Sequence, residues 1–354
     1  MMMNRIRIDL RRFISISCFI LIFAFLGGCA TFRGKSPEVE KPKPEVSKVE
    51  TPPMERTSLN FIAVIAREGD TLSFFASKYL NDPSMDWFIA EFNDIETLTP
   101  GQTLIIPLKP YQKGGLTSKG YQTVPVLSYH HFSLDRADKL TVTKSTFEEQ
   151  MKFLKDRGYR VITLDQLFDF LEFKGQIPKK SVVINIDDGW RSTYDITFPI
   201  LKKYGYPATL FVYTDLIVGS EKTLSWDLIQ EMANNGMDIQ CHTKTHRRLT
   251  TIDQKESFKE YFEAIEKELS ACEAMIKKKL NKEVKYLAYP YGDTNPLVIE
   301  LLKKHGYRGA FTIKRGGNPF FIHTYRLNRS MIYGDFDLNQ FEKNLTVFTE
   351  ESLK

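Results

Sequence analysis

The sequence has few cysteines, histidines and tryptophans: four, six and three of them in 354 residues. It also lacks a long apolar run, because residues 13–26 fall short of the roughly 20 residues that span a bilayer as a helix. The chain also has little net positive charge. The formal net charge is +5, and four arginines and one aspartate in residues 5–12 supply +3 of it. This balance argues against nucleic acid as a partner.

What is present is an ordinary globular composition. Hydrophobic residues make up 42% of the chain and charged residues 26%, so a real core can be buried. The length suits two or three domains. We therefore expect a folded protein whose stability does not depend on disulfides.

The first 28 residues have the pattern of an export signal: a basic start, the apolar run 13–26, and small residues before Cys29. Leu26-Gly27-Gly28-Cys29 resembles the lipobox of bacterial lipoproteins. The resemblance implies that Cys29 is acylated and anchors the chain in the bacterial envelope, at the outer membrane facing the periplasm. A plain signal peptide or an uncleaved anchor is the alternative. Of the remaining cysteines, Cys241 and Cys272 are expected to be free and buried, although one bridge between them is possible.

Residues 29–59 are rich in Pro, Glu, Lys, Val and Ser, which predicts an extended disordered tether. Residues 60–110 predict a strand (61–66), two helices (71–79 and 86–92) and a second strand (103–107). The stretch Glu68-Gly69-Asp70-Thr71-Leu72, Asn93 and residues 98–107 resemble a LysM module. The resemblance implies a small βααβ domain that binds N-acetylglucosamine-containing glycans such as peptidoglycan. Residues 111–121 are assigned to a linker.

The rest of the chain, residues 122–350, alternates apolar runs with amphipathic helical stretches. The first helix is predicted to begin with a capping box at Ser145, and Gly158, Gly205 and Gly306 to end three helices. Alternation of this kind predicts an α/β fold with parallel strands and right-handed crossovers, and the number of units favours a barrel over an open sheet. The predicted strands are residues 124–129, 181–186, 208–213, 237–241, 286–288 and 309–313.

Two polar clusters follow predicted strands. Asp187 and Asp188 end the strand 181–186, and neighbouring carboxylates repel unless a cation or a proton compensates one of them. Asp-Asp-Gly is also a common turn sequence. However, His242 and His246 also follow a strand, where barrel enzymes place their sites. Together Asp188, His242 and His246 predict a site for one divalent metal with open positions suited to hydrolysis; zinc is the default ion, and iron, cobalt or nickel also fit.

Residues 185–189, 242–246 and 288–292 resemble, in order and spacing, three motifs of the polysaccharide deacetylases with the NodB homology domain, carbohydrate esterase family 4. The resemblance implies a distorted (β/α)7 barrel, with Asp187 as catalytic base and Asp188, His242 and His246 as metal ligands. It also implies that the backbone N–H of Tyr291 helps to form the oxyanion hole. Tyr289, Pro290 and Trp226 are expected to contact substrate.

The chain departs from the commoner family pattern at two places. Residues 125–131 resemble the N-terminal Tyr-His motif of the subgroup that deacetylates poly-β-1,6-N-acetylglucosamine, which makes His130 the candidate acid and leaves His131 structural. Ala288 stands where the commoner form has an Arg that steadies the catalytic Asp. Arg329 could take over that task, or it could be a surface residue. The motif that orients the acid is not identified.

These observations predict a hydrolase that removes N-acetyl groups from N-acetylglucosamine residues of an envelope or exported polysaccharide. The LysM-like residues indicate peptidoglycan, whereas the pair Tyr129-His130 indicates a β-1,6-linked glucosamine polymer. Two alternatives remain: a catalytically inactive glycan-binding lipoprotein, and an O-acetyl esterase on the same fold.

Overall fold

The computed structural model describes residues 55–111 and 114–351. The predicted signal peptide, Cys29 and most of the predicted tether lie outside these residues. Within them, no helix is both long enough and apolar enough to cross a bilayer.

The N-terminal part of the described chain forms a three-stranded antiparallel sheet in the order β1-β2-β3, which has its own hydrophobic cluster. Its predicted strand, helix, helix, strand order is confirmed, and the Thr71 side chain caps the first helix by accepting from Phe74 N. The predicted C-terminal boundary of the tether, residue 59, is too late in the sequence. Strand β1 lies within residues 29–59 and pairs with the edge of β2 that β3 leaves free. The elements are β1 (Glu55–Thr57), β2 (Phe61–Ile65), α1 (Leu72–Leu80), η1 (Pro83–Met85), α2 (Asp86–Phe92) and β3 (Thr103–Pro107).

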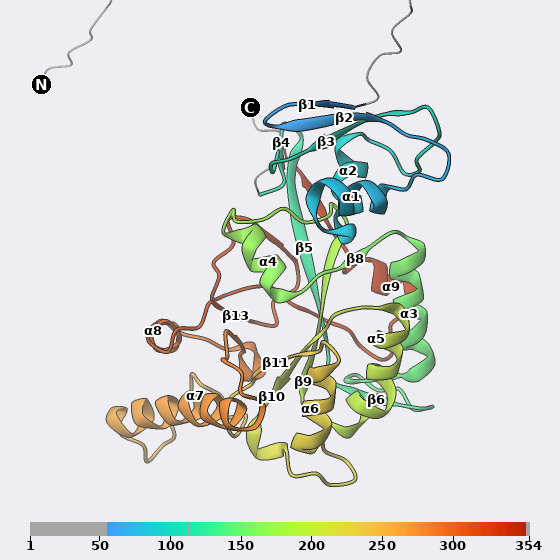
Figure 1. The fold of residues 1–354 in the computed structure, drawn as a ribbon. Helices are drawn as coiled ribbons and strands as arrows, with labels where there is room; N and C mark the ends of the chain where they lie inside the picture. Colours follow the sequence, from blue (N-terminus) through green and yellow to red (C-terminus); the bar gives the residue numbers. More distant parts are fainter. Residues whose placement is uncertain (1–54, 112–113, 352–354) are drawn as a thin grey trace, which may run out of the picture. The chain divides into compact units, whose positions relative to one another are not determined.

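The larger part of the described chain is built on parallel strands in the order β13-β12-β11-β10-β9-β5. Figure 1 labels five of them: β13, β11, β10, β9 and β5. β15 pairs in parallel with β5, and Leu327 just before it bridges to Phe311 in β13. Both edges of the sheet therefore meet the segment 327–331, which confirms the predicted distorted (β/α)7 barrel. The strands are β5 (Gly120–Tyr129), β9 (Ser181–Asp188), β10 (Thr209–Val212), β11 (Asp238–Cys241), β12 (Tyr286–Ala288), β13 (Gly309–Phe311) and β15 (Ser330–Met331).

Shorter strands extend this sheet. Three of them pair antiparallel with the first part of β5, one pairs with the start of β9, and two form a separate small sheet after β5. They are β4 (Leu116–Thr117), β14 (Gly317–Pro319), β16 (Phe348–Glu350), β8 (Arg160–Val161), β6 (His131–Ser133) and β7 (Thr141–Thr143).

Helices pack an extensive apolar core against the outer face of the barrel. The three predicted glycine ends are confirmed by positive φ angles of 71°, 66° and 80° at Gly158, Gly205 and Gly306. The predicted cap at Ser145 is wrong: Thr143, still extended at the end of β7, caps the helix by accepting from Thr146 N. The helices are α3 (Lys144–Asp156), α4 (Leu164–Leu171), α5 (Phe198–Tyr204), α6 (Trp226–Asn234), α7 (Phe258–Leu280), α8 (Pro296–Lys304) and α9 (Leu338–Glu342).

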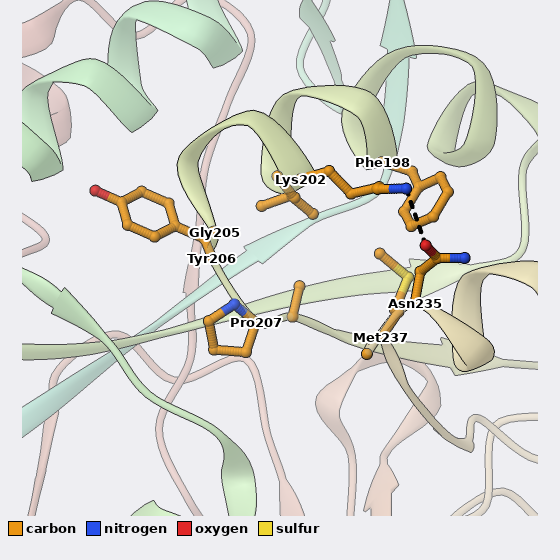
Figure 2. A pocket seen from close by; sticks show the side chains of 10 residues that line it. Phe198, Lys202, Gly205, Tyr206, Pro207, Asn235 and Met237 are labelled. Atoms are coloured by element: carbon orange, nitrogen blue, oxygen red, sulfur yellow. Dashed lines mark hydrogen bonds between the residues drawn. The ribbon is translucent and has the colours of Figure 1, made fainter. Parts of the chain in front are cut away.

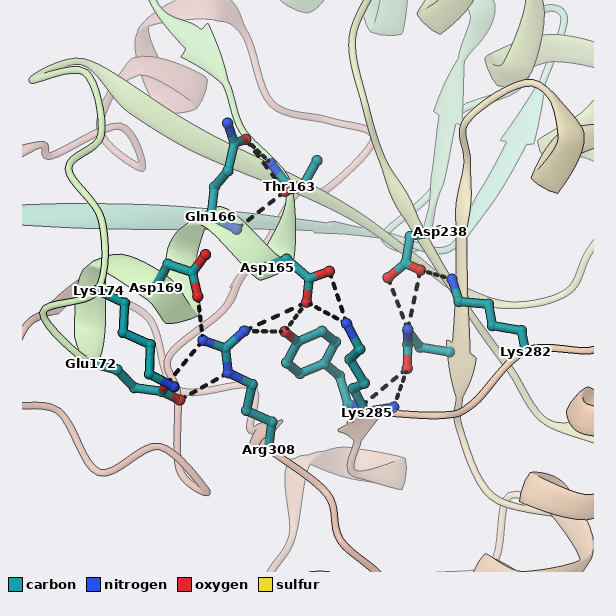
Figure 3. A network of polar contacts seen from close by, with 12 residues as sticks. Thr163, Asp165, Gln166, Asp169, Glu172, Lys174, Asp238, Lys282, Lys285 and Arg308 are labelled. Atoms are coloured by element: carbon teal, nitrogen blue, oxygen red, sulfur yellow. Dashed lines mark hydrogen bonds and ion pairs between the residues drawn. The ribbon is translucent and has the colours of Figure 1, made fainter. Parts of the chain in front are cut away.

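Helix α4 closes the amino-terminal end of the barrel. Its Phe168 ring lies 4.6 Å from the Tyr286 ring, within the cluster that fills the barrel interior. Arg308, just before β13, ties the same end to α4 by donating to Glu172 at 2.9 and 3.0 Å and to Asp169 at 2.6 Å (Figure 3). The amino-terminal end of the barrel is therefore closed by packed side chains and ion pairs. An active site is expected at the opposite end, where the strands have their carboxyl ends.

We expect Arg308→Met to lower the free energy of unfolding by about 2–3 kcal/mol, because several charge-assisted hydrogen bonds are lost at once. Urea denaturation followed by circular dichroism measures the change. Lys303→Met, which breaks an exposed pair with Glu300 and a long contact with the Tyr325 ring, is the control and should cost less than about 1 kcal/mol. Equal losses in the two variants would contradict a special role for Arg308.

Cys241 and Cys272 form a disulfide, so the expectation of free thiols was wrong. Cys241 ends β11 and Cys272 lies in the middle of α7, and their Cα atoms are 6.2 Å apart. The two residues are 31 positions apart in sequence. Their pairing depends on how α7 packs along β11, which no local pattern shows.

Candidate active site

A cavity of about 380 Å³ opens at the carboxyl ends of the parallel strands. Parallel strands end at one edge of a barrel, and this brings together side chains from β5, β9, β11 and the segment before β15. Of the predicted site residues, Trp226 and Pro290 do not line the cavity; Trp226 begins α6 and packs against the outer core. The lining residues are His130, Leu140, Asp187, Asp188, His242, His246, Arg248, Tyr289, Tyr291, Ile313, Arg329 and Met331.

Asp188, His242 and His246 lie close enough to share one ion, with ligand atoms all within 4.8 Å of one another. His246 Nε2 lies 3.7 Å from Asp188 Oδ1, and His242 Nε2 lies 3.8 Å from the same oxygen. The Nδ1 of His242 lies 2.7 Å from the carbonyl oxygen of Ala288, which can only accept a hydrogen bond. His242 therefore carries its proton on Nδ1 and keeps the Nε2 lone pair for a ligand bond.

The protonation states of both histidines suit metal binding. Burial lowers the pKa of His242 to about 4, even though Asp187 and Asp188 act in the opposite direction. Burial also lowers the pKa of His246, again against the pull of Asp188. Both rings are thus neutral near pH 7, the form that binds metals, and two imidazoles with one carboxylate are donors that zinc accepts.

Asp187 lies beside this group and is 1% exposed. Arg329 Nη1 donates to its Oδ1 at 2.8 Å and is equally buried, while His130 Nε2 lies 3.8 Å from Oδ2. Burial raises the pKa of Asp187, but the charge of Arg329 together with His242 and His130 outweighs burial, so the pKa lies below its ordinary value. Asp187 is therefore an ionised carboxylate between Arg329 and His130.

Tyr291 lies at the rim of the cavity with a left-handed backbone, φ 61°. Its ring is 50% exposed and lies 4.8 Å from the ring of His246. The guanidinium of Arg248 stacks on the Tyr291 ring, 4.4 Å from its centroid. A non-glycine residue with positive φ is uncommon and is often found at functional sites.

Three polar or aromatic residues at the site were not singled out from the sequence. Trp190 Nε1 donates to Asp188 Oδ2 at 2.9 Å, the Tyr213 ring lies 5.1 Å from His246, and Arg248 lines the cavity. Trp190 and Arg248 each stand two residues after a proposed metal ligand, and this proximity was the available signal. Tyr213 follows β10, whose carboxyl end also reaches this edge of the barrel.

Two further cavities differ in their relation to this edge. One of about 400 Å³ is lined by Ala208 and Met237, which precede β10 and β11, so it lies at the amino ends of these strands; Lys202 is its only charged lining residue (Figure 2). The other, of about 530 Å³, is lined by His131 and Thr141, the neighbours in sequence of His130 and Leu140 in the active-site cavity. Only the second of these two therefore lies at the end of the barrel that carries the catalytic groups.

Comparison with known proteins decides the family. Residues 174–310 match the family model described as polysaccharide deacetylase. The chain is 32% identical over 213 residues to the poly-β-1,6-N-acetyl-D-glucosamine N-deacetylase of Staphylococcus aureus (strain MRSA252), a match that covers 58% of this chain and 73% of that protein. The chain belongs to the polysaccharide deacetylase family. It is therefore an enzyme that acts on acetyl groups.

Solved structures agree with this polysaccharide deacetylase assignment. A Streptococcus pyogenes deacetylase in complex with acetate superimposes with a TM-score of 0.57 at 25% identity, covering 64% of this chain and 99% of that one. A polysaccharide deacetylase from Bacillus cereus gives a TM-score of 0.54 at 27% identity, covering 72% of this chain and 74% of that one. The barrel of this deacetylase is thus the fold of its relatives.

Proposed function

We propose that the protein is a metal-dependent hydrolase that removes N-acetyl groups from N-acetylglucosamine residues of an envelope or exported polysaccharide. The observation that carries the proposal is the grouping of Asp188, His242 and His246 next to the buried pair Asp187–Arg329 and to His130. The proposed metal ligands, base and acid all line one cavity, which argues against a catalytically inactive glycan-binding protein.

The residues suit the steps of amide hydrolysis. A metal ion held by Asp188, His242 and His246 would polarise the acetyl carbonyl and make a water molecule more acidic. Asp187, ionised and fixed by Arg329, takes the proton from the attacking water. His130, on the other side of Asp187, donates a proton to the departing amine, which is a poor leaving group without one. The backbone N–H of Tyr291 supports the negative charge that develops on the carbonyl oxygen.

Three features favour a polymeric substrate in the envelope. The Staphylococcus aureus relative is named for poly-β-1,6-N-acetyl-D-glucosamine, and the motif around His130 resembles that subgroup. The cavity of about 530 Å³ at the same end of the barrel contains polar groups, such as Arg191 and Glu221, that could bind a further sugar residue of a polymer. The LysM-like residues 60–110 would hold the enzyme on peptidoglycan, and acylation of Cys29 would anchor it to a membrane.

Acetate release from a panel of substrates tests the proposal. β-1,6-linked N-acetylglucosamine oligomers, chitooligomers, peptidoglycan and O-acetylated xylan are incubated with the zinc-loaded protein, and acetate and free amine are both measured. Equal amounts of acetate and amine from a glucosamine polymer would support N-deacetylation. Acetate from xylan alone would indicate an O-acetyl esterase, and retention on peptidoglycan without acetate release would indicate a binding protein only.

We expect His130→Ala to slow acetate release from an N-acetylglucosamine oligomer by about 10²-fold or more, because the amine then leaves without its proton donor. Hydrolysis of 4-nitrophenyl acetate should fall much less, since nitrophenolate needs no proton to leave. His323→Ala is the control, because its Nδ1 accepts from Tyr325 N–H and it lines neither the active-site cavity nor the cavity of about 530 Å³. Equal losses on both substrates would contradict the acid role.

We expect Arg329→Ala to lower kcat by about 10²-fold, because Asp187 loses the partner that holds its carboxylate in place. Arg329→Lys should recover part of the rate through its remaining charge. Steady-state kinetics with a melting curve for each variant measure the effect. An unchanged kcat in folded Arg329→Ala would show that the contact with Asp187 is not needed for turnover.

A further inference from the structure

The loop that carries both histidine ligands, residues 242–246, contains no regular secondary structure after β11. Thr243 and His246 in this loop have positive φ angles, 73° and 64°, which cost free energy in residues other than glycine. Such a conformation persists only where surrounding contacts determine it. The groups that satisfy the backbone of this loop therefore decide where the two imidazoles lie.

One side chain from helix α7 accepts from two neighbouring backbone N–H groups of this loop and from one hydroxyl group. Glu268 Oε2 accepts from the backbone N–H of Lys244 at 3.0 Å and of Thr245 at 2.8 Å. Its Oε1 accepts from the Thr245 hydroxyl at 2.7 Å. Glu268 is only 6% exposed, so these hydrogen bonds are shielded from water.

A second attachment lies one helical turn further along α7. Cys272 is bonded to Cys241, the residue directly before His242. Glu268 and Cys272 are four positions apart and so share one face of the helix. Helix α7 thus holds the loop at its start, through Cys241, and at its middle, through Lys244 and Thr245.

The remaining hydrogen bonds of the loop backbone are made with neutral groups. His242 N donates to the Val212 carbonyl oxygen at 2.8 Å, and the Nδ1 of the same residue donates to the Ala288 carbonyl oxygen at 2.7 Å. The carbonyl oxygens of Thr243 and Lys244 accept from Thr214 and Asp215 N–H groups at 3.2 and 2.9 Å. His246 N donates to the Thr243 hydroxyl at 3.1 Å. Within the described residues, Glu268 is the charged side chain that accepts hydrogen bonds from the backbone N–H groups of this loop, and it accepts two.

We propose that Glu268 is a positioning residue for the metal site: its carboxylate holds residues 244–245 so that His242 and His246 keep the spacing needed to bind one ion. This inference rests on the proposed metal site. Glu268 touches neither ligand ring in these contacts, and it acts through the backbone. Removing its carboxylate leaves two sheltered N–H groups without a partner, and the loop then loses the contacts that define its conformation.

Metal affinity of the full disulfide-bonded chain tests the proposal. The dissociation constant for Zn²⁺ is measured by competition with a chromophoric chelator, and a melting curve without zinc checks the fold of each variant. Glu268→Ala is expected to weaken zinc binding about 10- to 100-fold, as is usual for groups that orient metal ligands. Acetate release should recover when zinc is raised to saturate the variant, which a general loss of structure would not allow.

Two further variants sharpen the result. Glu268→Gln keeps one oxygen that can accept from both N–H groups, and Thr245 can turn its hydroxyl to accept from the new amide, so most of the zinc affinity should return. Glu263→Ala removes an exposed carboxylate from the same helix and should leave the affinity unchanged. If Glu268→Ala does not fold, Thr245→Val, which removes only the hydroxyl contact, should still weaken zinc binding severalfold.

The outcomes separate this inference from the proposed function. A folded Glu268→Ala that binds zinc as tightly as the unaltered protein would overturn the positioning role and leave the metal site standing. Equal weakening by Glu263→Ala would also overturn it. An unaltered protein that binds no zinc would overturn the metal site and the inference together.

Discussion

Asp187→Asn is expected to reduce acetate release by about 10³-fold or more while leaving zinc binding intact, because the amide cannot take a proton from water. Asn has nearly the shape of Asp and its oxygen can still accept from Arg329 Nη1, so the cavity should be preserved. Acetate release at saturating substrate and zinc content per chain are the two measurements. Loss of acetate release with unchanged zinc content indicates a base, whereas loss of both indicates a metal ligand.

The control for this variant is Asp227→Asn, an exposed carboxylate in the first turn of α6. It should change neither measurement. Because Arg329 is buried, Asp187→Asn also leaves a charge without its counter-ion and should lower the melting temperature. The assay is therefore run well below that temperature. Acetate release at the unaltered rate by Asp187→Asn would refute its assignment as the base.

His246→Ala is expected to abolish tight zinc binding and, with it, to lower acetate release by roughly 10³-fold or more, because the metal supplies several kcal/mol of transition-state stabilisation. His246 is the better choice of the two histidines, since His242 is more deeply buried and its loss disturbs the core. Zinc content after dialysis and acetate release before and after adding zinc measure the effect.

His323→Ala is the matched control for this experiment. His323 lines a different cavity and its Nδ1 accepts from Tyr325 N–H, so neither zinc content nor activity should change. Removing zinc from the unaltered protein with a chelator should reproduce the loss, and adding zinc should restore the rate. A zinc-free His246→Ala with full activity would exclude metal-dependent hydrolysis.

Local sequence patterns were enough to predict most of the barrel. Runs of apolar residues between glycine-ended helices predict buried parallel strands, and parallel strands end at one edge whatever the details of packing. Asp187, Asp188 and His242, which directly follow such runs, were therefore predicted to meet, and they line one cavity. The same logic did not extend to Trp226, which begins a helix and faces the outer core instead.

Local sequence patterns carry less information about where a segment begins or ends and which strands pair. The tether was predicted to reach residue 59 because its composition is polar, yet β1 pairs with the edge of β2 within it. Ser145 was predicted to cap α3, although Thr143 competes for the same role two residues earlier. In the first case the choice depends on the pairing of β1 with β2, and in the second on the pairing of Thr143 with Ser133 in β6, which keeps Thr143 extended.

By itself the sequence determined the alternation of strands and helices, the strand ends that carry Asp188 and His242, and the two-histidine spacing to His246. Only the tertiary structure decided that Arg329 pairs with Asp187, that Cys241 is bonded to Cys272, and that Glu268 holds the histidine loop. The physical reason is that a periodic pattern reports which face of an element is buried. The partner of a buried charge or thiol is set by how elements far apart in the chain pack together, and a charge such as that of Asp187 is kept ionised by that partner.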